Sequence, residues 1–106
     1  MRRAGAVIAL MLAAASACAA AERQLTVINE TDAAIEYFYA ESCLGGGWGA
    51  DRLGPDEVIE PGGRRLFKLS ARGDGCCYDF RAKLLTGASR QKHNVDLCRE
   101  PEWVVR

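Results

Sequence analysis

The clearest pattern of apolar and polar positions lies between Tyr78 and Leu84. Charged residues take every second position of this run, at Asp79, Arg81 and Lys83, and apolar residues stand between them. A period of two residues places neighbouring side chains on opposite faces of a β-strand. The run therefore predicts a strand with one face in a core and the other face exposed.

Other short segments are strand-like, because they are rich in β-branched, apolar and aromatic residues and end at turn signals. They are Leu25–Ile28, Ala34–Ala40, Arg64–Ser70, Gln91–Leu97 and Trp103–Val105. Alternation in Gln91–Leu97 places His93, Val95 and Leu97 on one side. Turns rich in glycine, proline and asparagine separate the segments, and a long glycine-rich loop at 43–55 holds Trp48.

No amphipathic helical stripe follows residue 21. The spacing of the strands and turns predicts an all-β domain, either a small antiparallel β-sandwich of immunoglobulin-like type or an open barrel.

The first 21 residues have the outline of a secretory signal peptide. Arg2 and Arg3 precede an apolar, alanine-rich run, and Ala19–Ala21 supplies the small residues of a cleavage site. We expect cleavage there, which leaves one β-domain at 22–106 in the periplasm or outside the cell. The alternative is a lipid-anchored envelope protein, with Cys18 as the lipidated residue. The apolar run is shorter than the roughly 20 residues of a membrane-spanning helix, so no transmembrane segment is expected in the mature chain.

The charge of the mature chain argues against nucleic acid as a partner. Residues 22–106 contain 12 basic and 14 acidic residues, a net charge of −2, and no basic stripe. No cofactor or metal motif is present, and we expect a monomer.

Four cysteines follow the predicted cleavage site: Cys43, Cys76, Cys77 and Cys98. In an oxidising compartment they predict two disulfides. Adjacent cysteines rarely bond to each other because the small ring is strained. Cys76 and Cys77 therefore need different partners, and two connectivities remain. We favour Cys76–Cys98 with Cys43–Cys77, although strict strand alternation points Cys98 outward, on the face of Cys77.

Asp79 and Arg81 share the outward face of their strand, and they can anchor the Trp48 loop if it folds over that face. Trp48 and Asp51 then form either a structural plug or a binding patch, since tryptophan is frequent at interface hot spots. His93 is the single histidine, and no nucleophile motif accompanies it. Cys76 and Cys77 lack the spacing of redox and zinc motifs.

Several motifs together resemble a family of small exported bacterial β-domains of uncharacterised function. They are Asn29-Glu30-Thr31 with the strand Ile35–Tyr39, the loop Trp48–Gly54, the turn Pro61-Gly62, the strand motif Cys76, Tyr78, Asp79 and Arg81, and the ending Val95–Cys98. The resemblance implies a sandwich-like domain with a shared disulfide at Cys76 and Cys98. It makes Cys43 and Cys77 additions in this chain, which supports their pairing. It implies no catalytic residue.

We therefore expect a non-enzymatic binding or accessory module of the bacterial cell envelope. It would act on an envelope protein or ligand through the Trp48 loop or an exposed strand edge. The alternative is a small periplasmic enzyme, either a hydrolase that uses His93 or a thiol-redox enzyme that uses Cys76 and Cys77.

Overall fold

The computed structural model describes residues 22–70 and 75–106, and six strands lie within them. These are β1 (Glu22–Asn29), β2 (Ile35–Ser42), β3 (Arg64–Ser70), β4 (Cys77–Leu84), β5 (Ser89–Asp96) and β6 (Glu102–Val105). The described residues contain no helix, which confirms the all-β prediction. The predicted signal peptide and Cys18 lie outside the described residues.

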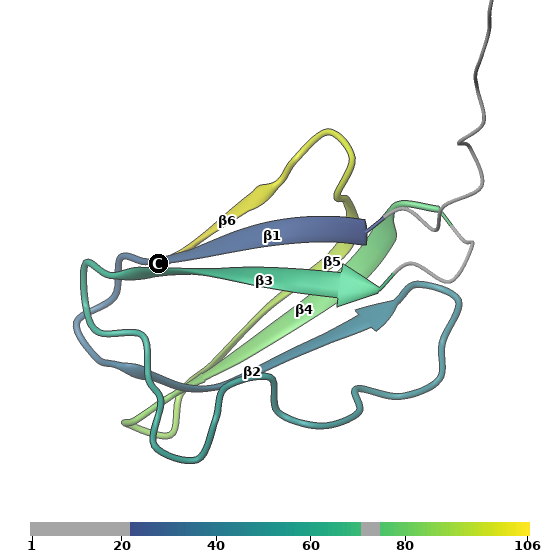
Figure 1. The fold of residues 1–106 in the computed structure, drawn as a ribbon. Coiled ribbons are helices and arrows are strands. Elements are labelled where there is room, and N and C mark those ends of the chain that lie inside the picture. Colours follow the sequence, from purple (N-terminus) through teal and green to yellow (C-terminus); the bar gives the residue numbers. More distant parts are fainter. Residues whose placement is uncertain (1–21, 71–74) are drawn as a thin grey trace, which may run out of the picture.

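The strands form two three-stranded sheets, ordered β3-β1-β6 and β2-β4-β5, which face each other across the core (Figure 1). The chain alternates between the sheets from β1 to β4, and only β4 and β5 follow one another within a sheet. The sheets do not close on themselves, so the sandwich is the observed architecture. Antiparallel pairs dominate, as expected. The exception is β6, which runs parallel to β1.

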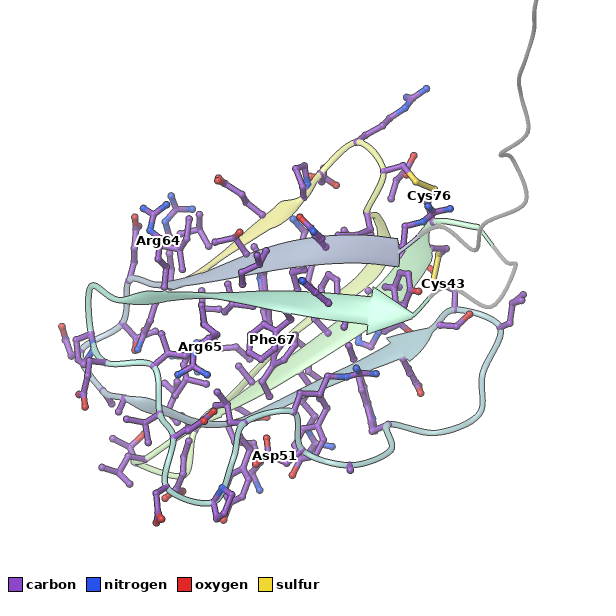
Figure 2. The ribbon with its side chains drawn as sticks, in the orientation of Figure 1. Cys43, Asp51, Arg64, Arg65, Phe67 and Cys76 are labelled. Atoms are coloured by element: carbon purple, nitrogen blue, oxygen red, sulfur yellow. A yellow bond between two sulfur atoms is a disulfide. The ribbon has the colours of Figure 1, made fainter. Side chains whose placement is uncertain are left out.

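The core lies between the two sheets and is rich in aromatic rings. Phe38 on β2 stacks on Phe67 of the facing β3, with ring centroids 4.4 Å apart. Phe80 on β4 stacks on Trp103 of β6 at 5.8 Å. The four apolar residues of the β4 alternation are all buried, so the predicted inner face is confirmed. These contacts fix the separation of the sheets, which are drawn with their side chains in Figure 2.

A β-bulge in β5 changes the direction of one predicted side chain. Tyr78 pairs with Val95 and Phe80 pairs with Lys92, so His93 and Asn94 together oppose the single residue Asp79. Asn94 has a φ of 57°, in the left-handed region that asparagine tolerates. The prediction that His93 shares a side with Val95 and Leu97 is therefore wrong. The extra residue shifts the alternation, and His93 is exposed on the outer face.

The predicted turn after β1 is built around a buried asparagine. Asn29 is 0 % exposed, and its side-chain amide donates to the carbonyls of Ala33 (2.9 Å) and Ile59 (2.8 Å). Its Oδ1 accepts from the backbone N–H of Thr31 at 2.9 Å. A buried polar side chain must be paired in this way to avoid a desolvation penalty. The Asn-Glu-Thr motif thus has a structural role, because it ties β1 to the segment that precedes β3.

Candidate functional site

Both disulfides lie at one end of the β2-β4-β5 sheet. Cys43 bonds to Cys77, with Cα atoms 5.4 Å apart. Cys76 bonds to Cys98, with Cα atoms 5.5 Å apart. This is the pairing that the sequence favoured. The first bridge joins the residue after β2 to the first residue of β4, and the second joins the residue before β4 to the segment after β5. Unlike the disulfide of antibody domains, which crosses between sheets, these bridges make a single sheet rigid.

The same bonds bear on the redox and metal chemistry of these cysteines. Sulfur atoms of Cys76 and Cys98 lie within 4.8 Å of a carboxylate oxygen of Asp96, a grouping with metal-ligand chemistry. The two sulfurs are bonded to each other, and a metal-binding or nucleophilic cysteine needs a thiolate. In the described structure this cluster is a staple at the end of the sheet.

The aromatic residues divide between the core and one outer face. The chain has three phenylalanines, three tyrosines and two tryptophans. Five of these rings are buried in the core: Phe38, Phe67, Tyr78, Phe80 and Trp103. The other three belong to the outer side of the β2-β4-β5 sheet and its adjoining loop: Tyr37, Tyr39 and Trp48. We call this surface, together with Glu41, Asp79, Arg81 and His93, the aromatic face.

Two tyrosines form the β2 part of the aromatic face. The rings of Tyr37 and Tyr39 have centroids 6.4 Å apart and planes inclined by 10°. Tyr37 is 40 % exposed, one of the most exposed large apolar residues in the described structure. Across the sheet, Tyr39 pairs with Arg81 and Tyr37 pairs with Lys83. No sequence motif marks these tyrosines as a site, although their placement at every second position of a strand is a usable signal for a shared face.

Trp48 reaches the other part of the aromatic face. Its ring lies 6.3 Å from the imidazole of His93, inclined by 55°. His93 in turn places Nδ1 3.5 Å from Oδ1 of Asp79 and Nε2 3.0 Å from Oε1 of Gln91. The same Asp79 oxygen accepts the backbone N–H of Asn94 at 2.8 Å, which holds the bulge. The sequence allowed Asp79 and Arg81 to anchor the Trp48 loop if that loop folded over this face. In the structure the Trp48 ring lies against His93, and His93 lies against Asp79.

Two buried polar atoms on the aromatic face have no hydrogen-bond partner within the described residues. They are Nε of Arg81 and Oε1 of Glu41. Glu41 lies directly across from Asp79, and Arg81, across from Tyr39, lies two residues further along β4. Buried donors and acceptors are normally paired.

Asp51 has a different role from Trp48, with which the sequence grouped it. Its Oδ1 accepts the backbone N–H groups of Phe38 at 2.9 Å and of Leu53 at 3.0 Å. The backbone N–H of Arg52 donates to the carbonyl of Phe38 at 2.8 Å. Asp51 therefore fastens the loop along the free edge of β2. Its Oδ1 is occupied by these two backbone N–H groups.

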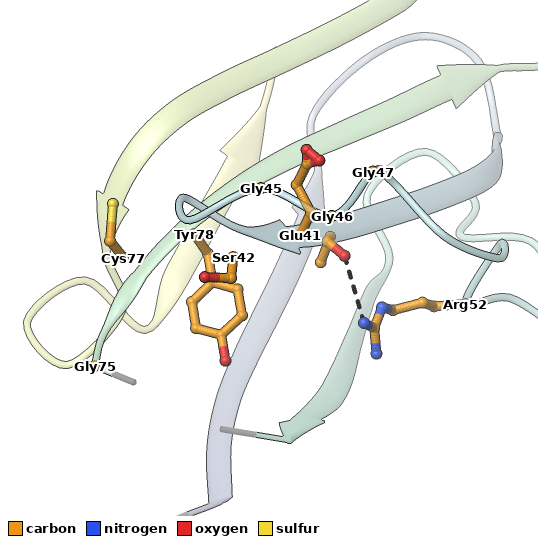
Figure 3. Close-up of a pocket in the computed structure, with 10 residues that line it drawn as sticks. Glu41, Ser42, Gly45, Gly46, Gly47, Arg52, Gly75, Cys77 and Tyr78 are labelled. Carbon is orange, nitrogen blue, oxygen red and sulfur yellow. Dashed lines mark hydrogen bonds between the residues drawn. The ribbon is translucent and has the colours of Figure 1, made fainter. Parts of the chain in front are cut away.

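The glycine-rich loop and the end of β2 enclose a hollow of about 260 Å³ (Figure 3). Glu41, Arg52, Tyr78 and the glycines at 45–47 are among its lining residues. Arg52 closes one side, where Nη2 donates to the carbonyl of Ala40 at 3.4 Å. Because Glu41 belongs to both, the hollow adjoins the aromatic face.

Comparison of the chain with protein-family models, with curated proteins and with solved structures gave no match. Among the described residues, no helix has the length and apolar character to cross a membrane.

Proposed function

We propose that this protein is an exported, non-enzymatic binding module of the bacterial cell envelope, and that the aromatic face is its binding surface. The observation that carries the proposal is the gathering of every aromatic ring outside the core on one face. Tyrosine and tryptophan dominate the energy of many interfaces, because they bury large areas at a low entropic cost. The sheet that carries this face is held by two disulfides, so little flexibility has to be lost on binding.

The disulfides also support export. Disulfides persist in oxidising compartments and are rare in the cytosol. Intact mass of the protein recovered from the periplasm tests this part. A mass that begins at Glu22, with four thiols seen only after reduction, supports soluble export. A mass that begins at Cys18 with acyl chains supports the lipid-anchored alternative, and a full-length mass with free thiols contradicts both.

The enzymatic alternative has less support. Among the described residues, the hydrogen-bonding neighbours of the His93 ring nitrogens are Asp79 and Gln91, whereas a Ser-His-Asp site needs a nucleophile at the second nitrogen. Cys76 and Cys77 are in separate disulfides, so a thiol-redox reaction would first have to reduce a staple.

Binding of the purified protein to isolated cell-wall polymer, outer-membrane vesicles and periplasmic extract tests the proposed surface. Tyr37→Ala and Trp48→Ala should each weaken binding to one of these fractions by roughly tenfold or more, as hot-spot residues do. Leu85→Ala is the matched control, because Leu85 is 63 % exposed directly after β4, outside the aromatic face. A loss of binding counts only if the variant has the same urea unfolding midpoint as the wild type. Equal binding by all three variants would remove the aromatic face from the proposal, and unfolding of Trp48→Ala would make Trp48 a structural plug.

A further inference from the structure

One strand edge in the described structure differs from the other three. The free edge of β2 is covered by the 51–59 segment, through Asp51, Arg52 and an Ile35–Ile59 bridge. The β6 edge is short, with four residues, and the β5 edge carries the bulge. Short edges, bulges and covering loops are the usual means of protecting an edge. β3 has seven residues and pairs only with β1.

The register shows which backbone groups of β3 face away from β1. Val27 pairs with Arg65 and Leu25 pairs with Phe67. The N–H of Asn29 donates to the carbonyl of Gly63 at 2.9 Å, and the N–H of Thr26 donates toward β6, to the carbonyl of Pro101. Odd-numbered residues of both strands are therefore bonded to each other. The N–H and C=O groups of Arg64, Leu66 and Lys68 point outward, and the described residues supply them with no hydrogen bond on that side.

The side chains at these three positions give the edge a definite chemistry. Leu66 is 50 % exposed, and the exposed cations Arg64 and Lys68 flank it on the same face. Neither cation forms an ion pair or a hydrogen bond within the described structure, and the residues opposite them on β1 are the uncharged Ile28 and Gln24. Arg64 projects to the opposite side of β3 from Arg65 and Phe67 (Figure 2).

Arg65, the remaining cation of β3, is already neutralised. Its Nη1 lies 2.8 Å from Oε1 of Glu57. The unpaired charge at this edge is therefore positive and confined to the outer face.

We propose that the β3 edge binds an extended acidic segment of a partner protein by β-augmentation. Outward N–H and C=O groups would supply the main-chain hydrogen bonds, and alternate side chains would supply the selectivity. The complementary segment has the pattern acid-x-apolar-x-acid, with the apolar residue opposite Leu66 and the acids opposite Arg64 and Lys68. The pattern is symmetric, so it suits a parallel or an antiparallel strand.

Charge also decides against a second copy of the chain as the occupant. An antiparallel β3–β3 pair centred on Leu66 would place Arg64 opposite Lys68 of the second copy. Like charges directly opposite each other destabilise a sheet. The two cations thus discourage self-pairing and favour an acidic strand. This surface lies on the other sheet from the aromatic face, so the inference does not depend on the proposed function.

The test is a titration of the oxidised protein, followed by amide NMR and hydrogen exchange. The probe is a blocked seven-residue peptide of threonines, with valine at the centre and glutamate two positions away on either side. Saturating peptide should slow exchange of the amides of Leu66 and Lys68 by roughly tenfold or more, while the amides of Arg65 and Phe67, already bonded to β1, should change little. This alternation is specific to strand addition.

The matched controls reverse the charges. A peptide with lysine in place of glutamate should bind at least roughly tenfold more weakly, as two like-charged cross-strand pairs replace two favourable ones. The R64E/K68E double variant should reverse that preference. Equal affinity for both peptides, no binding of the acidic peptide, or uniform protection along β3 would overturn the proposal. The protein could also dimerise without peptide, as its concentration rises, and show the same alternating protection along β3. That result would overturn the proposal in favour of self-pairing.

Discussion

Removal of the Asp51 carboxylate should destabilise the domain by more than its position in a loop suggests. One carboxylate oxygen accepts two backbone N–H groups, from Phe38 at 2.9 Å and from Leu53 at 3.0 Å. Phe38 lies in β2 and is 0 % exposed. In an Asp51→Ala variant, its backbone N–H would therefore have little access to water as a replacement acceptor. An unsatisfied buried donor costs about 1–3 kcal/mol, and hydrogen bonds to charged groups contribute about 1.5–3 kcal/mol each.

Asp51 is itself half-buried, and the Leu53 N–H can be hydrated once the loop moves. We therefore expect Asp51→Ala to lower the free energy of unfolding by about 2–3 kcal/mol rather than by the sum of both bonds. For a domain of this size that corresponds to a fall in Tm of about 10–20 °C. Asp51→Asn keeps an acceptor oxygen and should lose only about 1 kcal/mol.

Urea unfolding of the oxidised protein measures the effect, with an unchanged m-value as the check that only stability has changed. Asp56→Ala is the matched control, because Asp56 is an exposed acid of the same loop. It should lie within about 0.5 kcal/mol of the wild type. The Asp51→Ala variant should also self-associate more, since it uncovers the β2 edge. If Asp51→Ala and Asp56→Ala are equally stable, Asp51 does not fasten the loop, and its carboxylate becomes available for a binding role again.

Two further predictions concern the staple and an ion pair. Replacement of Cys76 and Cys98 together by serine removes a bridge with a sequence separation of 22 and should lower the unfolding free energy by about 3 kcal/mol through a less constrained unfolded chain. An equal urea midpoint for this double variant and the wild type would contradict the prediction. The hydrogen bond from Arg65 lowers the pKa of Glu57 below its ordinary value of 4.5. The stability that this pair contributes is present above pH 4.5 and is lost as the pH falls through the lowered pKa of Glu57. Below about pH 5, the urea midpoint should therefore fall less steeply in Glu57→Gln than in the wild type. Parallel pH profiles of the two proteins would refute this.

The local pattern of apolar and polar residues was sufficient to predict the strands, because alternation is a property of neighbouring residues. In β4, the alternation of apolar and charged residues identified the buried and exposed faces from the sequence. The bounds of β3 coincide with the predicted segment Arg64–Ser70. The asparagine-centred turn after β1 was also readable, since asparagine and threonine form turns through bonds to nearby backbone groups.

The candidate site depended on contacts that no local pattern encodes. The bulge at His93 and Asn94 exists because of how β5 pairs with β4, and it moves His93 to the outer face beside Asp79 and Trp48. The role of Asp51 depends on the loop returning to Phe38, 13 residues earlier in the chain.

The sequence by itself therefore determined the all-β class, the inner face of β4 and the need for two disulfides, because strand alternation and cysteine count act over short range. Only the tertiary structure decided that β6 runs parallel to β1, that three aromatic rings gather on one face, and that β3 keeps a free edge. The physical reason is that each of these features depends on which strands lie beside each other. That choice is made by packing of the aromatic core between the sheets, through contacts such as Phe38 with Phe67 and Phe80 with Trp103.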